Sequence, residues 1–130
     1  MKVMVFVQMQ PKDETGAMPS DELLAAMSAY NDELVTAGVM LEVGGLTPTA
    51  EGARVAFSGG TTSVVDGPFT ESKEIVVGYW VWEVGSLEEA VEWARRCPSD
   101  PNDASTSWLE LRPCISLEDF AERFDEEPAA

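Results

Sequence analysis

Hydrophobic and polar positions along the chain follow two periods, which together predict a protein of mixed α and β structure. A nearly continuous apolar run over residues 3–9 predicts a central strand that is buried on both faces. Helical spacing of apolar residues after Ser20 predicts a first helix that ends at Gly38, where a left-handed cap is expected. Residues 39–43 then form a second predicted strand, ahead of Gly44-Gly45.

The rest of the chain predicts another strand, helix and strand, with a hairpin inserted before them. Two short β segments surround residues 58–61, whose sequence SGGT is typical of a tight turn. Residues 75–84 are the longest strand candidate. Ser86 and Glu89 form a capping box that opens a second helix, expected to end by Cys97. The final elements expected are a strand over residues 108–112 and a short helix over residues 116–124.

This order of elements predicts an α+β fold. Two β-α-β units with antiparallel closure form a ferredoxin-like β-α-β-β-α-β sandwich, with an antiparallel sheet and its helices on one face. The β-hairpin is an insertion, and a C-terminal helix follows the last strand. A chain of 130 residues holds a single core. We assign that core to residues 1–115, and residues 116–130 to a C-terminal helix and acidic tail.

The longest strand candidate has two apolar faces. Strand alternation places Ile75, Val77, Tyr79 and Val81 on one face and Val76, Trp80, Trp82 and Val84 on the other. A single helix layer covers only one face of a sheet. The second face is therefore expected to pack against another copy of the chain, which predicts a homodimer. Trp80 and Trp82 could also stack a ligand, although large aromatics in strands more often pack in a core or an interface.

Composition narrows the classes of function. The chain carries 8 Lys and Arg against 24 Asp and Glu, a net charge of −16, so neither nucleic acid nor membrane is an expected partner. It contains no histidine, which removes His-based catalysis and most zinc or copper sites, and neither a metal nor another cofactor is predicted. No apolar run is long enough to span a membrane. Because no secretory signal is evident, we expect a cytoplasmic protein with free thiols at Cys97 and Cys114.

Several short motifs, most of them downstream of the hairpin, carry a family resemblance. They are Asp66-Gly67-Pro68-Phe69, Glu71, Lys73-Glu74, Gly78-Tyr79, Leu87-Glu88-Glu89-Ala90, Cys97-Pro98 and Glu110-Leu111-Arg112-Pro113. Together they resemble the YCII-related, DGPF-domain family from residue 1 to about residue 113. The resemblance implies a dimeric α+β barrel, in which two sheets pack face to face, and a small-molecule cleft near that sheet. It implies no particular reaction, since most DGPF members have no established activity and the His that a few related enzymes use with an Asp is absent here.

The first candidate site surrounds the DGPF tetrapeptide. The carboxylate of Asp66 can bond backbone N–H groups just downstream and so fix a tight turn, or it can act as a base or polar anchor in a cleft. Lys73 lies near the same strand end, together with Glu71 and Glu74. A Lys among carboxylates stays protonated, so Lys73 is better suited to hold an anionic group than to act as a base.

The second candidate site follows the last strand. Alternation puts Trp108, Glu110 and Arg112 on the face away from the helices, with the two leucines between them toward the helices. Glu110 and Arg112 can pair with each other or with a partner subunit. Arg112 can alternatively hold a carboxylate or phosphate. Gln8 is expected on the same outward face, where its amide bonds either within the sheet or to a ligand.

Three functions are consistent with these residues. The first is a homodimer that binds a small molecule, with an anionic one as an option, at Lys73, Glu110, Arg112 and Gln8. The second is a regulatory protein-interaction module whose acidic surface meets a basic partner. Some DGPF members lie near extracytoplasmic-function sigma factors in bacterial genomes, so the resemblance suggests such a factor as the partner. The third is an enzyme that uses Asp66 or Glu110 as its base, without histidine.

Overall fold

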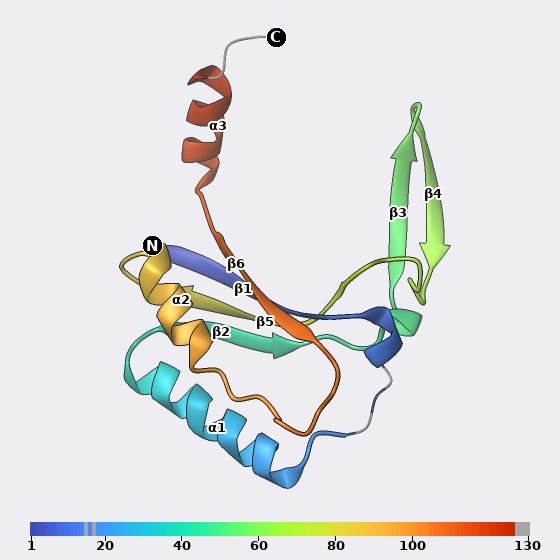
Figure 1. Cartoon of the computed structure of the whole chain (residues 1–130). Coiled ribbons are helices and arrows are strands. Elements are labelled where there is room, and N and C mark those ends of the chain that lie inside the picture. The colour runs from blue at the N-terminus through green and yellow to red at the C-terminus, as the bar shows by residue number, and fades with distance from the viewer. Residues whose placement is uncertain (15, 17, 127–130) are drawn as a thin grey trace.

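A four-stranded sheet and a separate two-stranded hairpin form the β structure of the protein (Figure 1). The computed structural model describes residues 1–14, 16 and 18–126. In chain order, the elements are β1 (Lys2–Met9), the 3-10 turn η1 (Pro11–Asp13), α1 (Asp21–Thr36), β2 (Met40–Gly45), the 3-10 turn η2 (Thr49–Glu51), β3 (Ala53–Ser58), β4 (Thr61–Asp66), β5 (Ile75–Glu83), α2 (Leu87–Arg95), β6 (Ser107–Pro113) and α3 (Leu117–Glu126).

The main sheet has the strand order β2-β5-β1-β6, and each neighbouring pair is antiparallel. Helices α1 and α2 cover the same face of this sheet, which we call the helix face (Figure 1). The opposite face, which we call the outer face, carries neither helix. The prediction of an α+β chain with an antiparallel sheet is confirmed. Strand β1 is central as expected, but it is not buried on both faces, because Met4 and Phe6 on its outer face are only partly buried.

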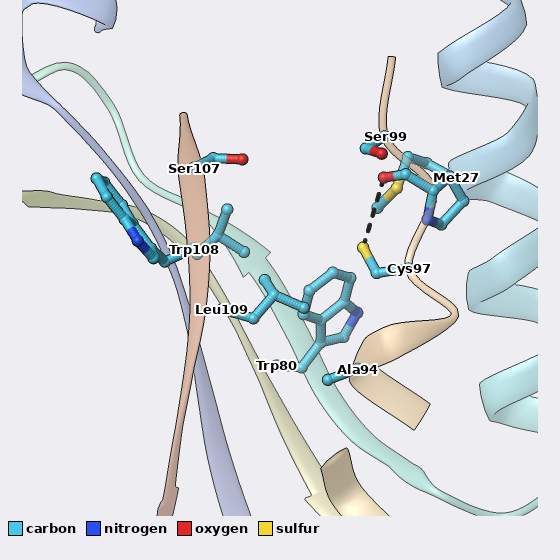
Figure 2. Close-up of a pocket in the computed structure, with 10 residues that line it drawn as sticks. Met27, Trp80, Ala94, Cys97, Ser99, Ser107, Trp108 and Leu109 are labelled. Atoms are coloured by element: carbon cyan, nitrogen blue, oxygen red, sulfur yellow. Dashed lines mark hydrogen bonds between the residues drawn. The ribbon is translucent and has the colours of Figure 1, made fainter. Parts of the chain in front are cut away.

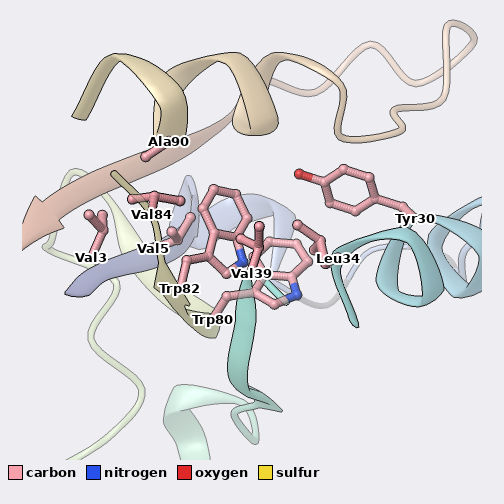
Figure 3. Close-up of a cluster of buried hydrophobic side chains, with 9 residues drawn as sticks. All are labelled: Val3, Val5, Tyr30, Leu34, Val39, Trp80, Trp82, Val84 and Ala90. Carbon is pink, nitrogen blue, oxygen red and sulfur yellow. The ribbon is translucent and has the colours of Figure 1, made fainter. Parts of the chain in front are cut away.

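The hydrophobic core lies on the helix face. Val3 and Val5 of β1 stand opposite Trp82 and Trp80 of β5. Trp82 and Leu34 of α1 are both 0% exposed, and each such side chain contributes about 1.5–3 kcal/mol through burial. Both tryptophans therefore pack in the core, and Trp80 also borders the cavity described below. The rest of the buried cluster, drawn in Figure 3, is Tyr30, Val39, Val84 and Ala90.

The helix boundaries follow from local capping groups. The hydroxyls of Ser20, Ser86 and Ser116 each accept a hydrogen bond at 3.1 Å from the backbone N–H three residues later, as predicted for helix starts. Gly38, just past the end of α1, has φ +73°, the left-handed conformation expected there. The carboxylate of Glu89 bonds the N–H of Gly85 and not that of Ser86, so the capping box is only half formed.

Two details of the strands differ from the sequence-based expectation. Gly44 and Gly45 belong to β2 and do not follow it. A Cβ at Gly44 would lie 2.7 Å from the ring of Tyr79, so this glycine lets the Tyr79 ring lie across β2. The register of β1 and β5 also shifts after Val7, which sets Val76 opposite Gln8. This irregularity breaks the strict alternation that grouped Val76 with the tryptophans.

The β3–β4 hairpin and α3 project away from the rest of the chain, as Figure 1 shows. Gly59 and Gly60 at the hairpin turn both have positive φ, as the SGGT turn predicted. Phe120 and Phe124 contact each other, with ring centroids 4.7 Å apart, but both rings are exposed. The acidic tail expected after α3, residues 127–130, lies outside the described residues. Within the described ranges, no helix combines the length and apolar character needed to cross a membrane.

Candidate functional site

A cavity of about 260 Å³ opens between the helix face of the sheet and the segment that joins α2 to β6. Figure 2 shows it in close-up. Its apolar wall comes from β1, α1, β5, α2 and β6, which contribute Val7, Met27, Trp80, Ala94 and Leu109. The connecting segment and the start of β6 add Cys97, Pro98, Ser99, Ser107 and Trp108.

Some of these lining residues point their side chains into the cavity, and others do not. Trp80, Leu109 and the Ser107 hydroxyl face the cavity in Figure 2, whereas the ring of Trp108 points to the other side of β6. This arrangement follows from strand alternation, because β6 presents every second residue to the helix face. Trp108 therefore borders the cavity through its backbone, and Trp80 is the aromatic ring that a bound molecule would meet.

Trp80 is held in place by polar and aromatic contacts. Its indole N–H donates to Oδ1 of Asn31 at 2.9 Å, and Tyr30 packs edge-on against it with ring centroids 6.0 Å apart. The Tyr30 hydroxyl in turn donates to the carbonyl of Trp93 at 2.6 Å. Burial raises the pKa of Tyr30 well above its ordinary value. The aromatic wall is thus fixed before any ligand arrives, which lowers the entropic cost of binding.

The polar groups around the cavity are neutral. Cys97 is partly buried, and burial raises the pKa of its thiol, so the uncharged form is favoured. The thiol points toward the carbonyl of Pro98, 3.7 Å away. Ser99 and Ser107 supply hydroxyls, and none of the ten lining residues carries a charge. An uncharged, mainly apolar molecule with one hydrogen-bonding group matches this lining.

Three of the predicted site residues lie on the outer face and not at the cavity. Gln8 stands opposite Trp108, and Arg112 stands opposite Met4 in the β1–β6 register. Arg112 and Glu110 approach each other to 3.8 Å, so the intrasheet ion pair considered above is present. Both side chains are exposed to solvent, and such pairs contribute little to stability.

Of the other two predicted site residues, Lys73 lies near the end of the sheet that holds Gln8, away from the end that holds Arg112. Lys73 is exposed and precedes Ile75, which pairs with Met9 at the end of β1. Arg112 pairs with Met4, and five strand residues span about 17 Å. A single chain therefore does not bring Lys73 and Arg112 together. Asp66 ends β4, exposed, and its carboxylate makes no hydrogen bond to any residue described in the structure.

The DGPF tetrapeptide is instead held by a residue that sequence reasoning missed. The N–H of Phe69 donates to Oγ1 of Thr49 at 3.3 Å, and the N–H of Gly67 donates to the carbonyl of Gly52 at 3.0 Å. The carboxylate of Glu14 accepts from both the backbone N–H and the hydroxyl of Thr49. These bonds tie three segments of the chain together, and no local motif around Thr49 marks it for this role.

Arg54 on β3 is a second residue whose role was not predicted from the sequence. Its guanidinium donates to Glu71 at 3.3 Å and to the hydroxyl of Ser72 at 2.8 Å. It also lies 4.0 Å from the ring centroid of Phe69, a cation–π contact. Arg54 thus joins the base of the hairpin to the loop before β5. Its place among only eight basic residues of an acidic chain was the signal available in the sequence.

Within the described residues, no group of three or more Cys, Asp and Glu side chains is arranged to hold a metal ion. Cys97 and Cys114 are not joined, which confirms the prediction of two free thiols.

An antiparallel sheet, one helix layer and an uncharged cavity between them define an α+β protein whose sequence contains no histidine. The chain belongs to the YCII-related family, because its residues 1–107 match the YCII-related domain. It is also similar to an uncharacterized protein of Rhizobium meliloti (strain 1021), with 37% identity over 93 residues. The matched segment covers 72% of this chain and 73% of that protein. The family resemblance read from the motifs is confirmed. Helix α3 lies beyond the matched residues.

Proposed function

We propose that this chain is a cytoplasmic, DGPF-type member of its family that binds a small uncharged molecule in the cavity beside Trp80. The observation that carries the proposal is the lining of that cavity, which combines a fixed indole ring, two hydroxyls and no charged side chain. Apolar walls with a few placed polar groups are the usual construction of small-molecule sites. The proposal includes no reaction.

The cavity volume limits the size of the ligand. An apolar protein cavity of about 150 Å³ admits benzene, and this one measures about 260 Å³. A single substituted ring or two fused rings therefore fit the space. A hydroxyl or carbonyl group on the ligand would bond Ser99 or Ser107.

Self-association forms the second part of the proposal. We infer a ferredoxin-like subunit whose outer face packs on a second copy, as in a dimeric α+β barrel. The partly exposed side chains of Met4, Phe6, Tyr79 and Val81 support this, since strand pairing places them together on the face that no helix covers. An anion site built from Lys73 and Arg112 would need two copies, because these residues lie about 17 Å apart along one sheet.

Equilibrium dialysis with two probes of the same size tests the cavity proposal. At neutral pH, 2-naphthol is uncharged and 2-naphthoate is an anion. We expect the naphthol to bind at least about tenfold more tightly, because the cavity offers the naphthoate carboxylate no cation to replace its water. Equal or tighter binding of the naphthoate would contradict the uncharged site and favour a role for Lys73 or Arg112.

A matched pair of variants locates the binding. Ser107→Phe places a ring at the cavity wall, whereas Thr106→Phe adds the same ring to the neighbouring exposed position, which does not line the cavity. We expect the first variant to abolish naphthol binding and the second to leave it unchanged. Binding that survives in Ser107→Phe, with the fold intact, would remove the cavity from the proposal.

The acidic character of the chain favours a second candidate function. With a net charge of −16, the surface suits a regulatory contact with a basic protein, and an extracytoplasmic-function sigma factor is the partner that the family resemblance suggests. Native mass spectrometry of freshly purified protein separates the two functions. A retained small molecule supports the first, and a stoichiometric basic protein without a small molecule supports the second.

A further inference from the structure

Within the described residues, two elements of the fold make little contact with the rest of the chain. Helix α3 has ten residues and the hairpin has two strands of six, and within the described residues neither makes extensive contact with the main sheet or its helices. Isolated helices shorter than about 12–15 residues are marginal in water, and so is an isolated two-stranded hairpin. Both elements therefore need a surface that covers them.

Each of these elements also presents a row of exposed apolar side chains. Val55 and Val64 stand opposite each other in the hairpin, and Phe57 lies two residues along on the same face and is 79% exposed. On α3, Leu117 is 88% exposed, and Phe120 and Phe124 follow at spacings of three and four residues, which places all three on one stripe. We call these surfaces the hairpin face and the α3 stripe.

The two surfaces lie at opposite ends of the main sheet. The hairpin is inserted between the end of β2 and the start of β5, where Gly45 pairs with Gly78. Helix α3 follows Pro113, which pairs with Val3 at the other end of β1. The nine residues of β5 span about 26 Å between these ends. Both elements rise on the side away from α1 and α2 (Figure 1), so one chain does not bring its own two surfaces together.

We propose that a second copy of this chain covers them, with the α3 stripe of each subunit packed against the hairpin face of the other. This inference rests on the homodimer proposed above. When two outer faces meet around a two-fold axis that exchanges the ends of the sheets, α3 of one copy comes beside the hairpin of its partner, and the same contact forms a second time. In such a dimer the hairpin face and the α3 stripe of both copies are covered, and neither apolar surface remains in water.

The size and the number of these apolar surfaces favour a second copy over another protein. Each chain carries one stripe and one matching face, of about 15 Å and 20 Å in length. Six apolar side chains per contact, at about 80–100 Å² each, bury about 1,000 Å² over two contacts, a substantial part of a stable interface. The acidic residues Glu118 and Glu122 lie off the stripe, so two chains of charge −16 meet there through uncharged side chains.

Disulfide trapping tests this contact directly. In a background with Cys97→Ala and Cys114→Ser, one chain carries Val64→Cys on the hairpin face and another carries Ala121→Cys beside the α3 stripe. Under mild oxidation of the mixture, we expect a linked pair containing one chain of each kind, identified by mass. Each chain alone should remain unlinked, and a chain with both cysteines should form intermolecular links only.

A pair of matched α3 variants supplies an independent readout. Phe120→Ser with Phe124→Ser removes the stripe, whereas Glu118→Ser with Glu122→Ser alters the opposite side of the same helix. By sedimentation equilibrium, we expect the first variant to raise the dissociation constant of the dimer about a hundredfold or more, since central aromatic contacts dominate interfaces. The second variant should leave it within about threefold of the wild-type value.

The outcomes separate this inference from the proposed dimer. A dimer of unchanged affinity in the Phe variant, with no link between hairpin and α3 cysteines, would overturn the exchange of these elements and leave sheet-to-sheet packing in place. A monomeric wild-type protein would overturn both. If the Phe variant instead loses only a copurified foreign protein, the occupant is not a second copy and the inference fails.

Discussion

Replacement of Gly67 by alanine puts the observed packing of the DGPF tetrapeptide to a direct test. A Cβ at this position would lie 1.6 Å from the carbonyl oxygen of Thr49 and 2.6 Å from its carbonyl carbon. Heavy atoms in contact are normally separated by roughly 3.5 Å, so the two segments must move apart by about 2 Å. The obstacle is backbone and not a flexible side chain, and the shift therefore displaces the whole η2 turn.

The free-energy cost follows from the contacts that this displacement breaks. The hydrogen bonds from Gly67 to Gly52 and from Phe69 to Thr49 are lost, and the Glu14 carboxylate loses its position on Thr49. Each such bond contributes about 0.5–1.5 kcal/mol. Phe69, now 8% exposed, also becomes partly solvated. We expect Gly67→Ala to lower the free energy of unfolding by about 2–4 kcal/mol.

Urea denaturation, followed by tryptophan fluorescence, measures this difference, and Gly45→Ala is its matched control. No heavy atom lies within 4 Å of a Cβ built at Gly45, and its φ is not positive. The control should remain within about 0.5 kcal/mol of the wild type. If Gly67→Ala is as stable as Gly45→Ala, the tetrapeptide does not pack against Thr49 in solution, and the account of its role is refuted.

Three further predictions concern the core, the thiols and the outer face. Leu34→Ala should cost about 3–5 kcal/mol in urea denaturation, because the side chain is fully buried; a loss below about 1 kcal/mol would contradict its place in the core. Iodoacetamide should modify the exposed Cys114 before the partly buried Cys97. Burial raises the pKa of the Cys97 thiol above the ordinary 9.0, so Cys97 should react appreciably only at higher pH. Equal modification rates for the two thiols, measured by mass spectrometry, would contradict the burial of Cys97. The negative charge of Glu42 and its hydrogen bond with the Tyr79 hydroxyl raise the pKa of Tyr79. In the variant Glu42→Gln, the Tyr79 phenolate should therefore form at lower pH, which ultraviolet absorbance measures. An unchanged titration would show that the contact between Glu42 and Tyr79 does not persist in solution.

The local pattern of the sequence was sufficient for most of the secondary structure. Ser20, Ser86 and Ser116 begin the helices, and residues 58–61 make the hairpin turn. These signals work because a cap or a tight turn depends on groups only a few residues apart. The order of such elements then limited the topologies available, and the α+β arrangement followed.

None of the site residues predicted from the sequence lines the cavity, for a physical reason. Gln8 of β1 and Glu110 and Arg112 of β6 lie on the same face of the sheet, and alternation predicted that face correctly. The cavity, by contrast, joins side chains from five elements, and residues such as Met27 and Ser99 carry no distinguishing motif. Their proximity depends on how α1 and the segment after α2 pack over the sheet, which sequence spacing does not encode.

The sequence by itself determined the acidic composition and the absence of histidine. It also predicted the order of the helices and strands, the two free thiols and the family. Only the tertiary structure decided that Trp80 and Trp82 face the helices, that Thr49 and Arg54 hold the DGPF loop, and that the hairpin and α3 stand apart from the main sheet. The difference lies in range. Capping, turns and alternation are governed by neighbouring residues, whereas the choice of which apolar face is buried depends on the free energy of packing segments that are distant in the chain.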